Sequence, residues 1–155
     1  MANATIYRVL EALQTKTAQN FADGYSGVDL RDSVVLGVLV DPPRTPYASV
    51  SFIDYTTEQG LNLSDYRMQA RFEVYCFCGG TTLADRTKNV LNLSSDVIKA
   101  ITEDRWLGLH NPDTTRTIDN TICNFTAVEG DRYGLDNVAI GYIEVTVTFQ
   151  SRTGV

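Results

Sequence analysis

The start of the chain carries apolar residues at the spacing of a helix. The apolar positions recur at intervals of three and four, which places them on one face of a helix; they are Ile6, Val9, Leu10, Leu13, Thr17 and Phe21. The pattern predicts an amphipathic helix from Ala4 to Phe21. Asn3 is its expected N-cap, and Gly24 lies just beyond its expected end.

A short apolar run rich in β-branched residues follows, from Val34 to Asp41. It predicts a strand that is covered on both faces. The next segment, 41–47, contains Pro42, Pro43 and Pro46, and proline both lacks an N–H and restricts the residue before it. We therefore interpret 41–47 as a stiff, extended hairpin loop or the edge of one, 48–55 as the returning strand and 56–64 as a further loop.

Strict alternation marks the strand from Arg67 to Phe77. One set of alternate positions is apolar and the other is mainly polar or charged; the two sets are Met68, Ala70, Phe72, Val74 and Cys76, and Arg67, Gln69, Arg71, Glu73 and Tyr75. A period of two gives a strand one face on the core and one face outward. We expect the charged face to be either solvated or docked on a neighbouring molecule.

The second half of the chain predicts one more helix and two more strands. Gly79 and Gly80 end the preceding strand, and Thr81 or Thr82 is a suitable N-cap for a helix whose apolar stripe reaches about Ile101. The stripe comprises Leu83, Val90, Leu91, Val97, Ile98 and Ile101. We expect 102–119 to be irregular but anchored on the core by Trp106, Leu107 and Leu109.

The last two strands are predicted at 122–129 and 138–150, with a turn at 130–137. Apolar positions change parity along the final strand, from Val138 and Ile140 to Ile143 and Val145. A β-bulge near Gly141 would explain the change, because one inserted residue turns every following side chain to the other face.

The predicted order of elements is helix, β-hairpin, long strand, helix and two strands. It lacks the βαβ alternation of a parallel nucleotide-binding sheet. We therefore expect an α+β fold with a mixed, largely antiparallel β-sheet of about five strands and two main helices packed on one face. The 155 residues are the size of one ordinary domain, so we treat 1–155 as a single domain.

Charge and composition narrow the range of partners. Thirteen basic and nineteen acidic residues give a net charge of −6, and the basic residues occur singly rather than as the patch that binds phosphates. We therefore expect no specific binding to DNA. We also expect no secretory signal and no membrane span, and reduced thiols for the three cysteines in an intracellular compartment.

A search for catalytic residues finds no constellation. His110, the one histidine, could act as a general base, but no nucleophile motif accompanies it, and we interpret it as a loop residue. Cys76, Cys78 and Cys123 could complete a zinc set with His110, although their spacing is more typical of buried thiols. We predict no catalytic residue, no metal and no cofactor, and hence that the protein is not an enzyme.

Taken together, these segments resemble the tail terminator proteins of tailed bacteriophages. The resemblance is one of pattern and covers most of the chain. It is carried by the opening helix at 6–13, the proline-marked segment from Pro42 into 48–50, the strand at 67–75, the helix ending at 97–101 and the closing strand at 140–147. Trp106-Leu107-Gly108-Leu109 also fits such proteins. The cysteines and the long loop at 113–121 do not match the family pattern.

The resemblance implies a structural virion protein, in the tail or neck after assembly in the host cytoplasm, that caps the tail tube as a homohexameric ring and joins the tail to the head. Its partners would be copies of itself, the tail-tube protein and a head-completion or connector protein, while DNA passes through the channel without specific binding. We expect the segments 41–47 and 55–66 to reach neighbouring subunits. The candidate interface residues are Arg44, Pro46, Tyr47, Tyr55, Tyr66, Arg67 and Arg71.

Two alternatives remain open from the sequence. A head–tail connector or neck-completion protein of the same virion would differ in its binding partner. A small-molecule-binding domain or a cryptic hydrolase would differ in its response to a ligand, since a ligand that binds the native state stabilises it.

Overall fold

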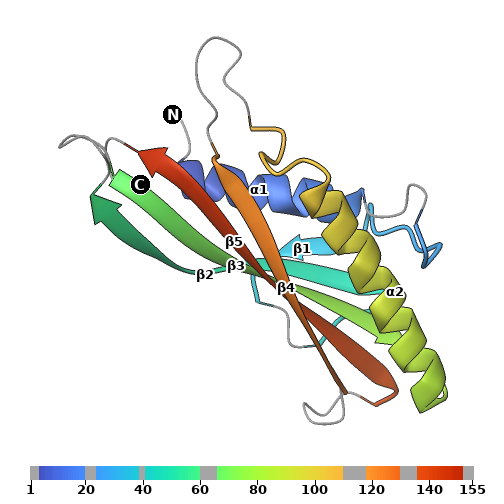
Figure 1. Cartoon of the computed structure of the whole chain (residues 1–155). Coiled ribbons are helices and arrows are strands. Elements are labelled where there is room, and N and C mark those ends of the chain that lie inside the picture. Colours follow the sequence, from blue (N-terminus) through green and yellow to red (C-terminus); the bar gives the residue numbers. More distant parts are fainter. Residues whose placement is uncertain are drawn as a thin grey trace.

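The computed structural model describes residues 4–19, 24–38, 41–59, 66–109, 118–129 and 136–151. They form two layers, with a twisted sheet in one layer and two helices in the other (Figure 1). The elements in chain order are α1 Thr5–Ala18, β1 Val34–Leu36, β2 Tyr47–Gln59, β3 Tyr66–Gly79, α2 Leu83–Thr102, β4 Asn120–Glu129 and β5 Val138–Ser151. Both helices pack on the same face, so the predicted α+β class is confirmed.

The sheet is mixed but largely antiparallel, as predicted. Its strand order is β1-β2-β3-β5-β4. Of the strand pairs in the described ranges, β1–β2 is parallel and the other three are antiparallel. The first and last strands of this order, β1 and β4, are therefore the edges of the sheet among the described residues.

The hydrophobic core lies between the sheet and the two helices. It contains the alternate residues of β3 that the sequence placed inward, including Met68, Phe72 and Val74, all fully buried. α1 contributes Val9 and Leu13, and further members from α2 and β5 include Val97, Ile101, Val145 and Phe149. Burial of this one continuous apolar layer is the main term that stabilises the fold.

The sequence analysis expected the proline-containing segment to be a hairpin loop, but among the described residues the structure shows no hairpin there. β1 and β2 run parallel, with Val34 beside Ala48 and Leu36 beside Val50. β1 is also only three residues long, because the chain turns at Gly37, whose φ is +103°. The periodicity of apolar residues predicts which face a residue occupies but not the direction of the neighbouring strand, and this is why the hairpin prediction was wrong.

β2 is longer than predicted and carries the irregularity of the sheet. It continues to Gln59 through the segment that we interpreted as a loop. Its register with β3 shifts between Phe52 and Asp54, so Ile53 is an extra residue of a β-bulge. Beyond the bulge, Asp54, Thr56 and Glu58 lie on the face away from the helices.

No bulge occurs at Gly141, where the sequence analysis placed one. The register of β5 with β3 and with β4 is unbroken at this position. The parity of apolar residues changes because Ile140 belongs to a small apolar cluster on the other face of the sheet. Gly141 lies beneath α2, and an added Cβ would stand 3.1 Å from Val90 Cγ2 and 3.3 Å from Phe125 Cε2.

The helix ends agree in part with the predictions. α2 begins after Thr82, whose Oγ1 accepts a hydrogen bond from the Asp85 N–H at 3.1 Å, which confirms one of the two expected caps. α1 ends at Ala18, before the predicted end, and Ala4 precedes it without a side-chain cap. The predicted cap Asn3 and predicted last residue Phe21 lie outside the described residues.

The buried face of α2 differs from the expected stripe. Leu83 and Leu91 are 59% and 42% exposed, whereas two polar residues, Ser94 and Asp96, are buried. Asp96 is buried because its carboxylate accepts hydrogen bonds from the chain after Gly24. Hydrophobicity alone could not predict this, because the partners of Asp96 are seventy residues earlier.

The segment after α2 is anchored on the core by two of the three predicted residues, and Trp106 is not one of them. Leu107 is 3% exposed and Leu109 packs against the same core. Asp104 closes this turn, since its carboxylate accepts the N–H groups of Trp106 and Gly108 at 3.0 and 2.8 Å. None of the helices in the described ranges has the length and apolar character needed to cross a membrane.

Candidate assembly surface

No described helix covers the sheet face that points away from α1 and α2 (Figure 1). We call it the open face. It is formed by the odd-numbered residues of β3 and the even-numbered residues of β4 and β5, with β2 contributing residues 47, 49 and 51 before its bulge and 54, 56 and 58 after it. Its side chains are aromatic and apolar at one end and charged in the middle.

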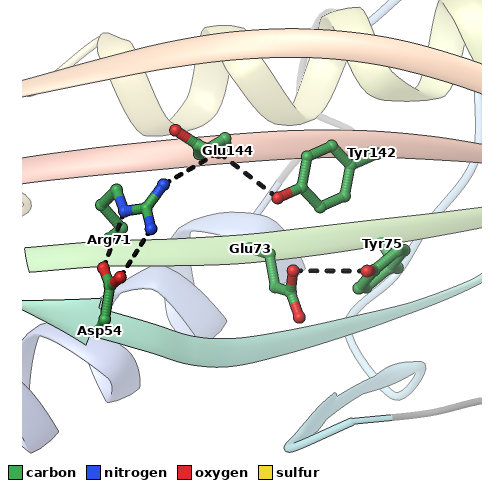
Figure 2. A network of polar contacts seen from close by, with 6 residues as sticks. All are labelled: Asp54, Arg71, Glu73, Tyr75, Tyr142 and Glu144. Carbon is green, nitrogen blue, oxygen red and sulfur yellow. Dashed lines mark hydrogen bonds and ion pairs between the residues drawn. The ribbon is translucent and has the colours of Figure 1, made fainter.

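An ion pair joins two strands in the middle of the open face. Arg71 Nε and Nη2 donate to the two carboxylate oxygens of Asp54 at 2.7 and 2.6 Å, as Figure 2 shows. This two-point geometry fixes both side chains. The hydrogen bonds from Arg71 lower the pKa of the Asp54 carboxyl, and those to Asp54 raise the pKa of Arg71.

Two glutamates face each other on neighbouring strands beside this ion pair. Glu73 of β3 and Glu144 of β5 are directly opposite partners, a position where like charges are unfavourable. Glu73 accepts hydrogen bonds from the Ser51 and Tyr75 hydroxyls at 3.1 and 3.3 Å. Glu144 lies 3.9 Å from Arg71 Nη1 and accepts from the Tyr142 hydroxyl at 3.5 Å (Figure 2).

The formal charges of this network sum to a net negative charge. The network contains three carboxylates and one guanidinium, and the guanidinium is committed chiefly to Asp54. Burial, followed by the charges of Glu73 and Glu144, raises the pKa of the Tyr142 hydroxyl. The middle of the open face is therefore a negatively charged area.

Aromatic side chains continue the open face toward its other end. The rings of Tyr75 and Tyr142 are 5.3 Å apart, and Tyr75 stacks on Phe77 at 6.3 Å. Phe77 packs with Tyr47 and Ile140 in a buried cluster outside the main core. Part of the open face is therefore buried by its own side chains.

The structure divides the seven predicted interface residues into two groups. Tyr55, Tyr66, Arg67 and Arg71 all lie on β2 and β3, in the half of the sheet farthest from β1. Tyr55 and Tyr66 are 43% and 40% exposed, and Arg67 helps to line a shallow groove of about 200 Å³ on the open face. Tyr55, Tyr66 and Arg67 are available for contact with another molecule, whereas Arg71 is held by its ion pair with Asp54.

The other three residues are held by contacts within the chain. Arg44 donates to the Asp32 carbonyl at 2.9 Å and to the Ser33 hydroxyl at 3.0 Å, and it lies over the Tyr47 ring. Tyr47 is only 9% exposed. Pro46 follows a cis peptide bond and lines a second groove. Their role in an interface stays a prediction.

That second groove has a volume of about 500 Å³ and lies between the chain after Gly24 and the start of α2. Its lining is mainly polar and comprises Tyr25, Ser26, Val28, Thr45, Pro46, Cys78, Gly79, Gly80, Lys88, Asn89 and Asn92. Asn89 Nδ2 donates to the Gly79 carbonyl at 3.0 Å, so part of the lining is already satisfied within the chain.

The three cysteines lie on the helix side of the sheet, and Cys78 also lines the second groove. Cys76 and Cys78 are buried beneath the helices on β3, and Cys123 is half-buried on β4. Burial raises the pKa of Cys78 to about 12 and that of Cys123 to about 11, so the thiols are protonated near neutral pH. Within the described ranges, no three residues of metal-binding type gather; His110 lies outside those ranges.

The sequence analysis missed the free edges of the sheet. Among the described strands, β4 pairs with β5 on one side only, and β1 covers β2 only at 48–50. Exposed apolar side chains lie along both edges, with Ile122 and Phe125 on β4 and Phe52 and Tyr55 on β2. The sequence signal was the stretch 56–59, which has no glycine or proline to end the strand and which we nevertheless interpreted as a loop.

Comparison with known proteins gives a structural match. No protein-family model matches the sequence, and no curated protein does. Among solved structures, the chain is similar to a chain in the virion of a native gene transfer agent (GTA) particle, with 13% sequence identity and a TM-score of 0.50. The similarity covers 94% of this chain and 99% of that chain, so the two share a fold over nearly their whole length.

Proposed function

We propose that this protein is a non-enzymatic structural component of a virion. Two independent observations support the proposal. The order and pattern of its segments resemble those of tail terminator proteins, and its fold, over nearly the whole chain, is similar to that of a chain from a virion particle. The second observation carries the proposal, because it depends on three-dimensional structure rather than on sequence pattern.

Within the virion, we assign to it the tail-terminator role. The protein would form a ring, expected to be a hexamer, on the end of the tail tube, stop tube growth and provide the surface to which the head or neck is joined. The open face and the free edges offer large surfaces for contacts with subunits and partners. Neutral and negative side chains on a channel wall would let DNA pass, because like charges repel the phosphates.

Mass photometry tests this proposal directly. The purified protein is measured alone and after mixing with the tail-tube protein of the same particle. We expect a species of about six copies, either alone or on the tube. A protein that ignores the tube but binds a head-completion or connector protein would instead be a neck protein.

A third outcome would favour the remaining alternative, a small-molecule-binding domain or a cryptic hydrolase. If the protein stays monomeric with both partners, and a small molecule that occupies the groove at Gly79 and Gly80 raises its melting temperature, the virion role is wrong. The matched control for this ligand test is Asn92→Leu. Its larger side chain fills part of the groove and does not touch the open face.

A further inference from the structure

The two free edges of the sheet are complementary in the direction of their strands. β2 is antiparallel to β3, β3 to β5 and β5 to β4. β4 therefore runs opposite to β2. When one copy is placed beside another in the same orientation, its β4 meets the neighbour's β2 as an antiparallel pair, the arrangement that most of the sheet already uses.

The backbone groups that point outward can be identified from the β1–β2 pair. The Ala48 N–H donates to the Ser33 carbonyl and the Gly37 N–H donates to the Val50 carbonyl, both at 2.8 Å. Residues 48 and 50 thus face the outer side of β2. The side to which the backbone N–H and C=O groups point alternates from residue to residue along a strand. The bulge at Ile53 shifts this alternation by one residue, so beyond it the backbone groups of residues 55, 57 and 59 point outward.

The same alternation can be followed across the sheet to β4. It leaves the N–H and C=O groups of residues 121, 123, 125 and 127 pointing away from β5. The carbonyl of Thr148 supports this assignment, because it accepts the Asp119 N–H at 2.8 Å and therefore faces β4. Both edges consequently carry rows of backbone groups with no strand beside them in the part of the chain that the structure describes.

The two edges also lie at the same level along the strands, and both carry exposed apolar side chains. Rows of paired residues cross the sheet from Phe52 to Cys123 and from Tyr55 to Thr121. Exposed apolar side chains lie next to both edges: Phe52 is 39% exposed, Tyr55 43%, Ile122 54% and Phe125 36%. Edge-to-edge pairing would cover these side chains and satisfy the backbone groups together.

Natural proteins protect edges that must stay unpaired, usually with proline, lysine or a bulge. The stretches 52–59 and 120–129 contain no proline, lysine or arginine. A bulge lies at the start of the β2 stretch, but the pairing of residues 54–59 with β3 is regular after it. These edges therefore have the features of strands that pair with a strand of another chain.

We infer that the edge of β4 in one copy pairs antiparallel with residues 54–59 of β2 in the next copy, so that the sheets join edge to edge around the ring. The inference rests on the proposed function, since it specifies how the ring closes. A closed ring needs two different, complementary surfaces on each chain. The β4 edge and the distal β2 edge are two such surfaces.

The test uses proline to remove one outward N–H from each edge. Thr57→Pro changes the β2 edge and Phe125→Pro the β4 edge, and proline is tolerated where an edge N–H faces solvent. Thr57→Val and Phe125→Val are the matched controls, because they keep the N–H. Each protein is checked for folding by circular dichroism and then measured by mass photometry with and without tail-tube protein.

We expect both valine variants to form rings and each proline variant alone to stay monomeric. An equimolar mixture of the two proline variants should give dimers and no rings, because each supplies the edge that the other lacks. Rings formed by both proline variants would overturn the inference alone. So would loss of assembly in only one of them, which would indicate a like-with-like contact of one edge.

A wild-type protein that stays monomeric under both conditions would overturn the proposed function and this inference together. If a proline variant does not fold, Tyr55→Lys and Phe125→Lys replace the pair, since a charge at an edge also opposes strand pairing. The expected pattern of monomers alone and dimers on mixing is the same, and rings from both lysine variants would likewise contradict the inference.

Discussion

Ser26 donates two hydrogen bonds to the buried carboxylate of Asp96, one from its backbone N–H at 2.9 Å and one from its hydroxyl at 2.6 Å. The Tyr25 N–H donates a third at 2.7 Å. Asp96 is 1% exposed. These contacts join the chain that follows α1 to the middle of α2 and define one side of the larger groove.

Removal of this carboxylate should destabilise the fold strongly. We expect Asp96→Ala to lower the free energy of unfolding by about 3 kcal/mol, because it leaves two backbone N–H groups without their acceptor. Ser26→Ala, which removes only the hydroxyl, should cost about 1 kcal/mol. Urea unfolding measures both. Ser95→Ala, at an exposed site on the same helix, is the control and should change stability by less than about 0.5 kcal/mol.

The N-terminal cap of α2 gives a second prediction. Thr82→Ala should lower stability by about 1 kcal/mol, since the Asp85 N–H loses its side-chain acceptor. Thr81→Ala is matched in chemistry and exposure and should have little effect. Equal losses in the two variants, measured by urea unfolding, would show that the cap is assigned to the wrong residue.

The close approach of α2 to β5 gives a third prediction. Gly141→Ala should destabilise the protein by about 2 kcal/mol, because the new methyl group meets Val90 and Ser94 on the helix above it. Ser94→Ala should recover part of this loss in the double variant, since it removes the nearest neighbouring atom. A Gly141→Ala protein as stable as wild type would contradict the packing described here.

The open face gives a prediction about pH. The pKa of Tyr142 is raised above its ordinary value of 10.0 by burial and by Glu73 and Glu144. A raised pKa in the folded state means that the unfolded chain loses this proton first as pH rises. The contribution of Tyr142 to the free energy of unfolding should therefore be constant below about pH 10 and should fall above it.

NMR of labelled tyrosine follows the titration directly. We expect Glu144→Gln to lower the pKa of Tyr142, because it removes one of the neighbouring negative charges, and Tyr142→Phe to reduce the loss of stability at high pH. A Tyr142 midpoint at its ordinary value in the wild-type protein would show that the network of Figure 2 does not persist in solution.

Much of the fold could be predicted from short-range pattern. The alternation in β3 and the apolar face at Val9 and Leu13 were predicted correctly, because one-sided burial imposes a fixed period on a strand or a helix. The direction of β1 was not predictable in this way. It depends on pairing with Ala48 and Val50 and on the turn at Gly37, and periodicity does not record these.

The candidate surfaces were predicted less completely. Tyr55 and Tyr66 were identified as the ends of the segment 55–66, and Arg67 as part of the charged face of the next strand; all three are exposed. Tyr47 was chosen because it ends the proline-containing segment 41–47, but it packs on Phe77 and Ile140, which are distant in sequence. Opposition of Glu73 and Glu144 depends on the register of two strands that are separated by α2, so no local pattern could have predicted it.

Growth of the tail tube tests the central proposal most directly. The tail-tube protein of the same particle is polymerised with and without this protein, and electron microscopy measures tube length and the positions of gold-labelled protein. We predict shorter tubes with the label at one end only, because a terminator ring blocks further addition there. Tubes of unchanged length without label at their ends would contradict the terminator role.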